Sequence, residues 1–158
     1  MNPMHRLRDR CAGFVVAVVV ATGGVVASAG TVAAVTCSGS SCNGTSPVTT
    51  GCSATSSTIT TGAIRDYTVY PPVTTGFVEL RASSACKTRW SRVTSYNWPE
   101  AAMGEIVERS DGLNYGDVDF NAHSSGYSPQ VYVGTSYTAS ACGWFGSPNQ
   151  EVGCTTSH

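Results

Sequence analysis

The chain has 158 residues, of which 9 are Lys or Arg and 10 are Asp or Glu, so its formal net charge is −1. A protein that binds nucleic acid usually has a strongly basic surface that neutralises phosphates, and this composition argues against nucleic acid as a partner. The length suits a single domain.

The first 29 residues have the pattern of a secretory signal peptide. Arginines at positions 6, 8 and 10 precede an apolar run that continues to Val26, and the small residues Ala27-Ser28-Ala29 follow as a cleavage site. An uncleaved membrane anchor is the alternative, but Thr22-Gly23-Gly24 interrupts the apolar run. We therefore expect residues 1–29 to be removed, and we expect a secreted, extracellular protein without stable membrane insertion.

Removal of this segment leaves 129 residues with six basic and nine acidic side chains. We expect a flexible N-terminus at 30–36 and a single disulfide-rich β domain at 37–158. Only 20 of the 129 residues are Val, Ile, Leu or Phe, which is few for a stable core. Disulfide bonds are therefore expected to contribute much of the stability, at roughly 3 kcal/mol for each closed loop.

Six cysteines remain after cleavage, and an even number in an exported chain predicts three disulfide bonds. The spacing does not decide which of the possible pairings forms. Zinc binding is the competing interpretation, but the sequence has no Cys-x-x-Cys motif, and only His123 and His158 follow position 29 as histidines. The cysteines expected to form disulfides are Cys37, Cys42, Cys52, Cys86, Cys142 and Cys154.

The N-terminal half of the predicted domain alternates between turns and strands. Gly, Ser, Asn and Pro fill residues 37–52, which predicts a series of turns between cysteines. Residues 54–70 are rich in Ser, Thr, Ile, Val and Tyr and predict a strand, which Pro71-Pro72 ends.

The most specific prediction is a β-hairpin over residues 76–93. From Phe77 to Ala82 the even-numbered residues are apolar, whereas Glu79 and Arg81 lie on the opposite face. This alternation is typical of a strand with one face against a core.

The C-terminal half predicts shorter strands. Residues 103–109 fit either a helix or a strand, and Gly104 together with the short length favours a strand. A turn at 111–116, an alternating segment at 117–121 and a last main strand or pair of strands at 131–138 follow. Together the segments predict an all-β fold, a small antiparallel sandwich or barrel that is disulfide-stapled and has a loop-rich N-terminal segment.

Two groups of residues resemble a known family. The first is Cys37-x-Gly39-x-x-Cys42-x-Gly44-x-x-Pro47 with Cys52, and the second is Val78-Glu79-Leu80-Arg81-x-Ser83-x-x-Cys86-x-x-x-Trp90-x-Arg92-Val93. Both resemble the secreted actinobacterial domain of unknown function 2690, from about Cys37 to Tyr137. The resemblance implies an extracytoplasmic module that follows a signal peptide or a membrane anchor. It implies no activity, because the family has none assigned.

Charged and aromatic side chains are the candidate binding residues. The charged candidates Glu79, Arg81 and Arg92 would bind a carboxylate or a sugar acid, or they form a structural salt bridge across the hairpin. Trp90 and Arg92 share a strand face, so we expect the ring to pack and the guanidinium to reach outward. Exposed rings would stack on sugars or proteins, whereas buried rings would replace missing aliphatic residues, and both interpretations remain open. The candidates are Trp90, Trp98, Trp144, Glu79, Arg81 and Arg92.

Metal and catalytic sites have less support in the sequence. Asp117, Asp119 and Asn121 offer oxygen ligands for calcium at alternating positions, but the glycine and glutamate of a helix-loop-helix calcium site are missing, and a solvent-facing strand explains the same residues. A hydrolase would need His123 beside a serine, or two carboxylates, and no Gly-x-Ser-x-Gly motif is present. The acids available for such a carboxylate pair are Glu100, Glu105, Glu108 and Asp111.

The sequence therefore favours a secreted, non-catalytic interaction or structural module of the bacterial cell surface, with no cofactor, resident metal or catalytic residue. A carbohydrate-binding module of the cell wall is the alternative, and a small secreted hydrolase is a third hypothesis. The expected partner is an unknown protein or a cell-wall glycan.

Overall fold

The computed structural model describes residues 34–96, 102–120, 124–146 and 151–158. The predicted signal peptide and most of the predicted flexible N-terminus lie outside these residues. Two short 3-10 helices precede the first strand, η1 (Gly39–Cys42) and η2 (Cys52–Thr55). Within the described ranges, no helix has the length and apolar character needed to cross a membrane.

The described residues are built mainly from β-strands. Sequences rich in Ser, Thr, Val and Tyr with frequent turns form them, as expected for a chain with few helix-forming segments. The strands are β1 (Ser56–Asp66), β2 (Val73–Ser83), β3 (Thr88–Ser95), β4 (Met103–Arg109), β5 (Asn114–Asp119), β6 (Ser125–Tyr127), β7 (Val131–Tyr132), β8 (Ala139–Phe145) and β9 (Glu151–Cys154).

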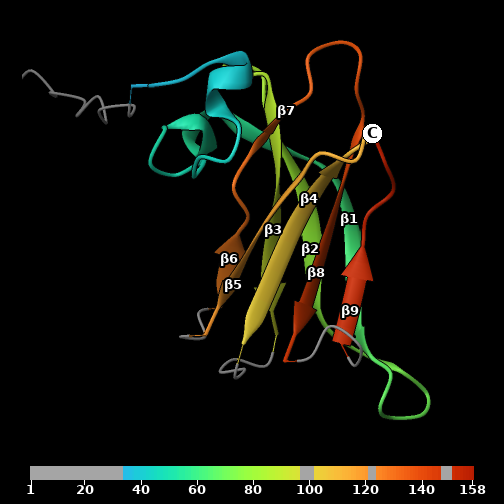
Figure 1. Ribbon diagram of the computed structural model, residues 1–158. Coiled ribbons are helices and arrows are strands. Elements are labelled where there is room, and N and C mark those ends of the chain that lie inside the picture. Colours follow the sequence, from blue (N-terminus) through green and yellow to red (C-terminus); the bar gives the residue numbers. More distant parts are fainter. Residues whose placement is uncertain (1–33, 97–101, 121–123, 147–150) are drawn as a thin grey trace, which may run out of the picture. The chain divides into compact units, whose positions relative to one another are not determined.

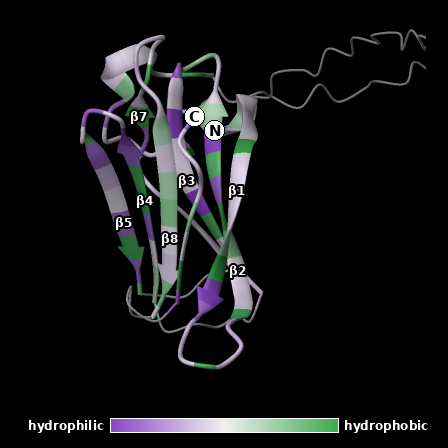
Figure 2. Ribbon diagram, turned by 90° about the vertical axis from the view of Figure 1, so that its right-hand side faces the viewer, coloured by the Kyte–Doolittle hydropathy of each residue, from purple (hydrophilic) through white to green (hydrophobic). Residues whose placement is uncertain are grey.

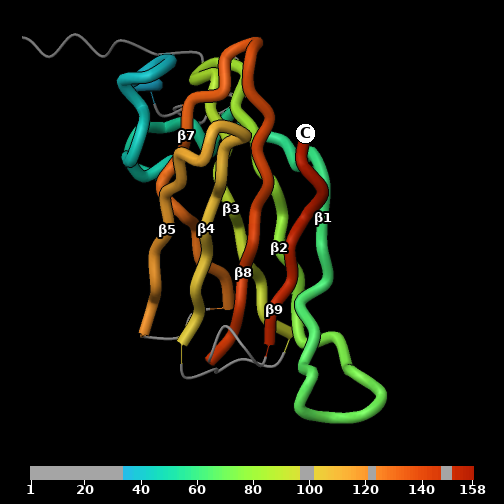
Figure 3. Tube along the Cα trace, turned by 45° about the vertical axis from the view of Figure 1, so that its right-hand side comes forward, coloured from blue at the N-terminus to red at the C-terminus, as the bar shows by residue number. Residues whose placement is uncertain are grey.

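The strands form one antiparallel sheet in the order β5-β4-β8-β9-β1-β2-β3-β6, and β7 also pairs with β3. The sheet curls so that β3 packs against β4 and β8, which nearly closes it into a barrel. Figure 3 shows β5, β4, β8, β9 and β1 side by side, with β2 and β3 behind them. The predicted all-β, antiparallel and disulfide-stapled fold is confirmed.

The inner face of the sheet holds the main hydrophobic core. The buried residues of this core are Ile64, Val78, Leu80, Val93, Met103, Val107, Val131, Val133, Ala139, Ala141 and Phe145. Strand β1 contributes only Ile64 to this core, because most of its other side chains are Ser or Thr, and it is drawn in nearly neutral colours in Figure 2. A core this small is consistent with the low aliphatic content.

The predicted hairpin and the strand at 103–109 are confirmed. Strands β2 and β3 pair from Gly76↔Ser95 to Ser83↔Thr88, which places Val78 opposite Val93 on the inner face. Strand β4 has the bounds that the sequence predicted. Alternation of side chains decided the hairpin, whereas Gly104 and the short length of the segment decided β4.

The prediction of a last main strand or pair of strands at 131–138 is wrong. Only Val131–Tyr132 pairs there, and the long strand of this region is β8. The inward residues of β8 include Ala139, Ala141 and Gly143, which have low strand propensity. They are small because β8 packs closely on β3: a Cβ atom at Gly143 would overlap the Val93 side chain. Tertiary packing therefore determines β8, although the composition of this segment does not indicate a strand.

Three disulfide bonds pair the six cysteines as Cys37–Cys42, Cys52–Cys86 and Cys142–Cys154. The third bridge joins residues that lie directly opposite each other on β8 and β9. The first two lie together over the outer face of the β2–β3 hairpin, where the sulfur atoms of Cys37 and Cys52 are 3.8 Å apart. They form a second buried cluster with Trp90.

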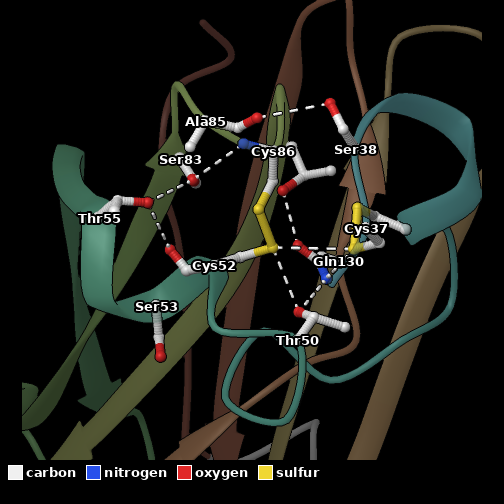
Figure 4. The surroundings of a disulfide bond; sticks show 12 residues. Cys37, Ser38, Thr50, Cys52, Ser53, Thr55, Ser83, Ala85, Cys86 and Gln130 are labelled. Carbon is white, nitrogen blue, oxygen red and sulfur yellow. Dashed lines mark hydrogen bonds between the residues drawn. A yellow bond between two sulfur atoms is a disulfide. The ribbon is translucent and has the colours of Figure 1, made fainter. Parts of the chain in front are cut away.

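A buried glutamine attaches residues 37–52, the cysteine-rich segment, to the sheet (Figure 4). The side-chain amide of Gln130 donates hydrogen bonds to the hydroxyl oxygens of Thr45 (3.0 Å) and Thr50 (2.9 Å), and its carbonyl oxygen accepts one from Thr88 on β3 (2.6 Å). Figure 1 shows this segment at the end of the sheet opposite the β1–β2 loop. One end of the sheet is therefore fixed by covalent and polar contacts.

The bridges are expected to differ in their contribution to stability, because a longer closed loop removes more entropy from the unfolded chain. Replacing both cysteines of a pair by alanine should lower the free energy of unfolding by about 4 kcal/mol for Cys52–Cys86 (separation 34), about 3 kcal/mol for Cys142–Cys154 (separation 12) and about 2 kcal/mol for Cys37–Cys42 (separation 5). Urea unfolding followed by tryptophan fluorescence measures these differences. Equal losses for the three pairs would contradict this order.

Candidate functional site

The structure brings the charged candidates of the hairpin together. A carboxylate oxygen of Glu79 lies 3.5 Å from Arg81, and its other oxygen lies 3.5 Å from Arg92. The Thr58 hydroxyl donates a further hydrogen bond to Glu79, and Arg81 donates to Ser56. Glu79 is buried and its charge is already paired within the sheet, so these residues form a structural network that ties β1, β2 and β3 together.

The tryptophan candidates have different environments. Trp90 is fully buried beneath the disulfides Cys37–Cys42 and Cys52–Cys86, so it has a structural role. Trp144 is half-buried on the outer face of β8 and covers Gly104, where a Cβ atom would overlap the indole ring. Trp98 lies outside the described residues.

A groove lies between the two edges of the sheet, where β5 and β6 approach each other without pairing. Its volume is about 380 Å³. The aspartates Asp117 and Asp119 of the calcium hypothesis both line it, whereas Asn121 and His123 lie outside the described residues. The residues that line the groove are Ser46, Val48, Glu105, Asp117, Val118, Asp119, Ser125, Gly126 and Tyr127.

Glu105 is the most unusual side chain of the groove. It lies on the inner face of β4 directly opposite Asp117 on β5, and only 2% of its surface is exposed. Its Oε2 atom has no hydrogen-bond partner among the described residues. A Cβ atom at Gly126 would lie 2.9 Å from both carboxyl oxygens, so glycine at this position leaves room for the carboxyl group.

Burial, together with the charges of Asp117 and Asp119, raises the pKa of Glu105 from 4.5 to about 8, although a hydrogen bond from the Tyr127 backbone acts in the opposite direction. At neutral pH the groove therefore contains a protonated carboxyl group beside two aspartates. Such a group donates a proton or hydrogen bond to a bound molecule, and it accepts a cation once it ionises.

The sequence contained a signal for Glu105 that the site prediction did not use. In the segment Met103-Gly104-Glu105-Ile106-Val107, strand alternation places Glu105 on the same face as two apolar residues that belong to the core. A carboxyl group at such a position is either paired or functional. Its position opposite Asp117 depends on the β4–β5 register, which the sequence alone does not determine.

Exposed apolar side chains gather on the loops at one end of the sheet. Strands β1, β3 and β5 end there, and the β1–β2 loop extends beyond the strands in both Figure 1 and Figure 3. Tyr70 is 97% exposed and Phe120 is 74% exposed, and no packing role explains such exposure. We call this set the aromatic end; its members are Tyr67, Val69, Tyr70, Val73, Tyr96 and Phe120.

Sulfur atoms are the only possible metal ligands that converge closely in the described part of the chain. The Sγ atoms of Cys37, Cys42, Cys52 and Cys86 lie within 4.8 Å of one another. They are consumed in two disulfide bonds, so they do not form a thiolate site in this state.

Comparison with known proteins places the chain in a family. The family model described as "Protein of unknown function (DUF2690)" matches residues 40–142. The chain belongs to this family. The DUF2690 match includes the whole Cys52–Cys86 bridge, the hairpin and the acidic groove, whereas Cys37 and Cys154 lie outside it. The resemblance seen in the sequence is thereby confirmed at the level of the family.

A curated relative is similar over part of the chain. "Uncharacterized protein YjfA" of Bacillus subtilis (strain 168) is 34% identical over 96 residues, which cover 51% of this chain and 58% of the relative. The chain thus spans less than two thirds of the length of that relative. No solved structure matches the chain significantly.

The raised pKa of Glu105 predicts how stability depends on pH. The folded protein holds this proton more tightly than the unfolded chain, so the contribution of Glu105 to stability is greatest below about pH 4.5 and falls as the pH rises to about 8. The slope contributed by this residue should approach 1.4 kcal/mol per pH unit, as an order of magnitude, between these limits. Urea unfolding of the parent and of Glu105→Gln at a series of pH values measures the difference.

A neutral amide removes the titration, so the Glu105→Gln variant should lose this slope and be more stable than the parent at pH 8. The control is Glu108→Gln, which removes a carboxylate from an exposed position on the same strand. Parallel pH profiles for the parent and Glu105→Gln would contradict the assignment.

Proposed function

We propose that this protein is a non-catalytic binding module that acts outside the cytoplasm, at the bacterial cell surface, and that the aromatic end is its contact surface. The observation that carries the proposal is the exposure of four aromatic rings on the loops at one end of the sheet. The partner is a component of the cell envelope.

The distribution of exposed and fixed parts supports a contact role. The cysteine-rich end is held by two disulfides and the Gln130 hydrogen bonds, whereas the opposite end presents Tyr67, Tyr70, Tyr96 and Phe120 to solvent. Exposed aromatic residues in one patch are typical of binding surfaces, because their burial in a complex contributes a large apolar area at a small cost in side-chain entropy. A rigid sheet lowers the entropic cost of presenting these loops.

An extracellular location is supported by covalent cross-links. Disulfides persist in oxidising compartments and are rare in the cytosol, and this chain forms three of them around a small core. The basic and apolar N-terminal segment of the sequence has the pattern of an export signal. Secretion accounts for both features.

A cell-wall glycan is the second candidate partner. Tyrosine combines a flat ring with a hydroxyl group, so it both stacks on a sugar face and forms hydrogen bonds to sugar hydroxyls. Tyr96 packs against Phe77 with ring centroids 5.9 Å apart, which gives a two-ring surface beside the β1–β2 loop. A glycan would bind to these rings, and a protein partner would use more of the exposed side chains of the aromatic end.

The test is a pull-down of the purified protein with isolated cell envelope and, separately, with purified peptidoglycan. Replacing Tyr70 by alanine should weaken binding to the envelope by about tenfold, as expected for the loss of an aromatic anchor. If Tyr70→Ala loses binding to peptidoglycan as well as to the envelope, the glycan is the partner.

The matched control is Tyr137→Ala. Tyr137 is also a partly exposed tyrosine, but it precedes β8 at the opposite end of the sheet, where its ring lies under Arg109. Equal binding by Tyr70→Ala and the parent, or an equal loss in both variants, would refute the aromatic end as the contact surface.

A further inference from the structure

We infer that the groove between β5 and β6 is a second binding site. It binds an organic cation, the guanidinium or ammonium group of a basic side chain on a partner protein. The inference extends the binding role proposed above to a different surface. It rests on the position of Glu105 and on the composition of the groove.

The first argument is the unsatisfied carboxyl group. Only 2% of the surface of Glu105 is exposed, yet the residue lines the groove. Its Oε2 atom lacks a hydrogen-bond partner among the described residues. A buried polar atom without a partner costs free energy that a core of apolar residues would avoid. A ligand that donates a hydrogen bond in the groove would satisfy this atom.

The second argument is the sign of the charge. Asp117 and Asp119 line the groove, Glu105 adds a third negative charge once it ionises, and no Lys or Arg is among the described lining residues. Arg92 on β3, whose guanidinium lies 5.7 Å from the centre of the Tyr127 ring, already pairs with Glu79. The negative charge of the groove therefore attracts a cation.

The third argument is size, which favours an organic cation over a metal ion. In the described residues the compact set of possible metal ligands consists of the four cysteine sulfurs, and the groove acids form no comparable set. The groove volume of about 380 Å³ exceeds the space that one ion requires, and Val48 and Val118 add apolar surface to its walls. A basic side chain has an aliphatic stem for such walls and several N–H donors for carboxylates that do not converge on one point.

The experiment is an NMR titration of the ¹⁵N-labelled protein with three short peptides: acetyl-Gly-Arg-Gly-amide, acetyl-Gly-Lys-Gly-amide and acetyl-Gly-norleucine-Gly-amide. The charged peptides should cause saturable shifts of the Gly126 and Tyr127 amide signals and of β5, with millimolar affinity that weakens as salt is added. The norleucine peptide has a similar stem without the charge and should cause no such shifts.

Variants assign the effect to the groove. Asp117→Asn should weaken binding of the arginine peptide by about tenfold, as expected for a lost charge-assisted hydrogen bond, and Glu105→Gln should have the same effect above about pH 8, where Glu105 of the parent is ionised. Glu108→Gln removes an exposed carboxylate from the same strand as Glu105 and should bind like the parent. Asp117 is exposed, so its replacement should leave the fold intact, and the amide spectrum of each variant checks this.

Several outcomes would overturn the inference. Equal shifts with the norleucine peptide would show that charge is not recognised, and absence of saturable shifts would show that the groove binds no basic side chain. Calcium chloride that shifts the same signals at lower concentration than the peptides would identify a metal site instead. The titration uses no cell envelope, so its result is independent of the pull-down with Tyr70→Ala.

Discussion

The anchoring of the cysteine-rich segment over Trp90 is the contact on which the rest of the structure depends. The Cys52–Cys86 bridge fixes this segment to the turn of the β2–β3 hairpin, and Gln130 satisfies the buried hydroxyl groups between them. Without this cover, the large ring of Trp90 would lie on the outer, solvent-facing side of the sheet. Few aliphatic residues are available to compensate, so covalent attachment replaces part of the hydrophobic stabilisation that larger domains obtain from their cores.

The same arrangement gives the sheet one end that is fixed by disulfides and an opposite end, the aromatic end, whose loops carry exposed side chains. The turns beside η1 and η2 are constrained by bridges, whereas the β1–β2 loop carries side chains that contribute nothing to the core. The groove between β5 and β6 lies along the side, at the place where the sheet fails to close. Incomplete closure is thus the reason that a carboxyl group of the inner face, Glu105, reaches a groove at all.

The sequence predicted the features that depend on local periodicity and failed where distant segments decide. Alternation was sufficient for the hairpin, and for β4 the short segment with Gly104 favoured a strand over a helix. The partners of the disulfides depend on how the cysteine-rich segment folds back over the hairpin, which spacing does not reveal. Strand β8 was missed because close packing on Val93 requires Gly143 and small neighbours. For Glu105 the inward position was readable, but the approach of Asp117 depends on strand register.

Strand β9 has only four residues, yet it connects β8 to β1 and so joins the two halves of the curled sheet. Its pairing with β1 involves only two residue pairs in register, Arg65↔Val152 and Asp66↔Glu151, and Cys142–Cys154 holds it to β8. If β9 detached, β8 and β1 would both present unpaired backbone edges. Unpaired edges are templates for intermolecular strand pairing, and β9 covers one edge of each of these two strands.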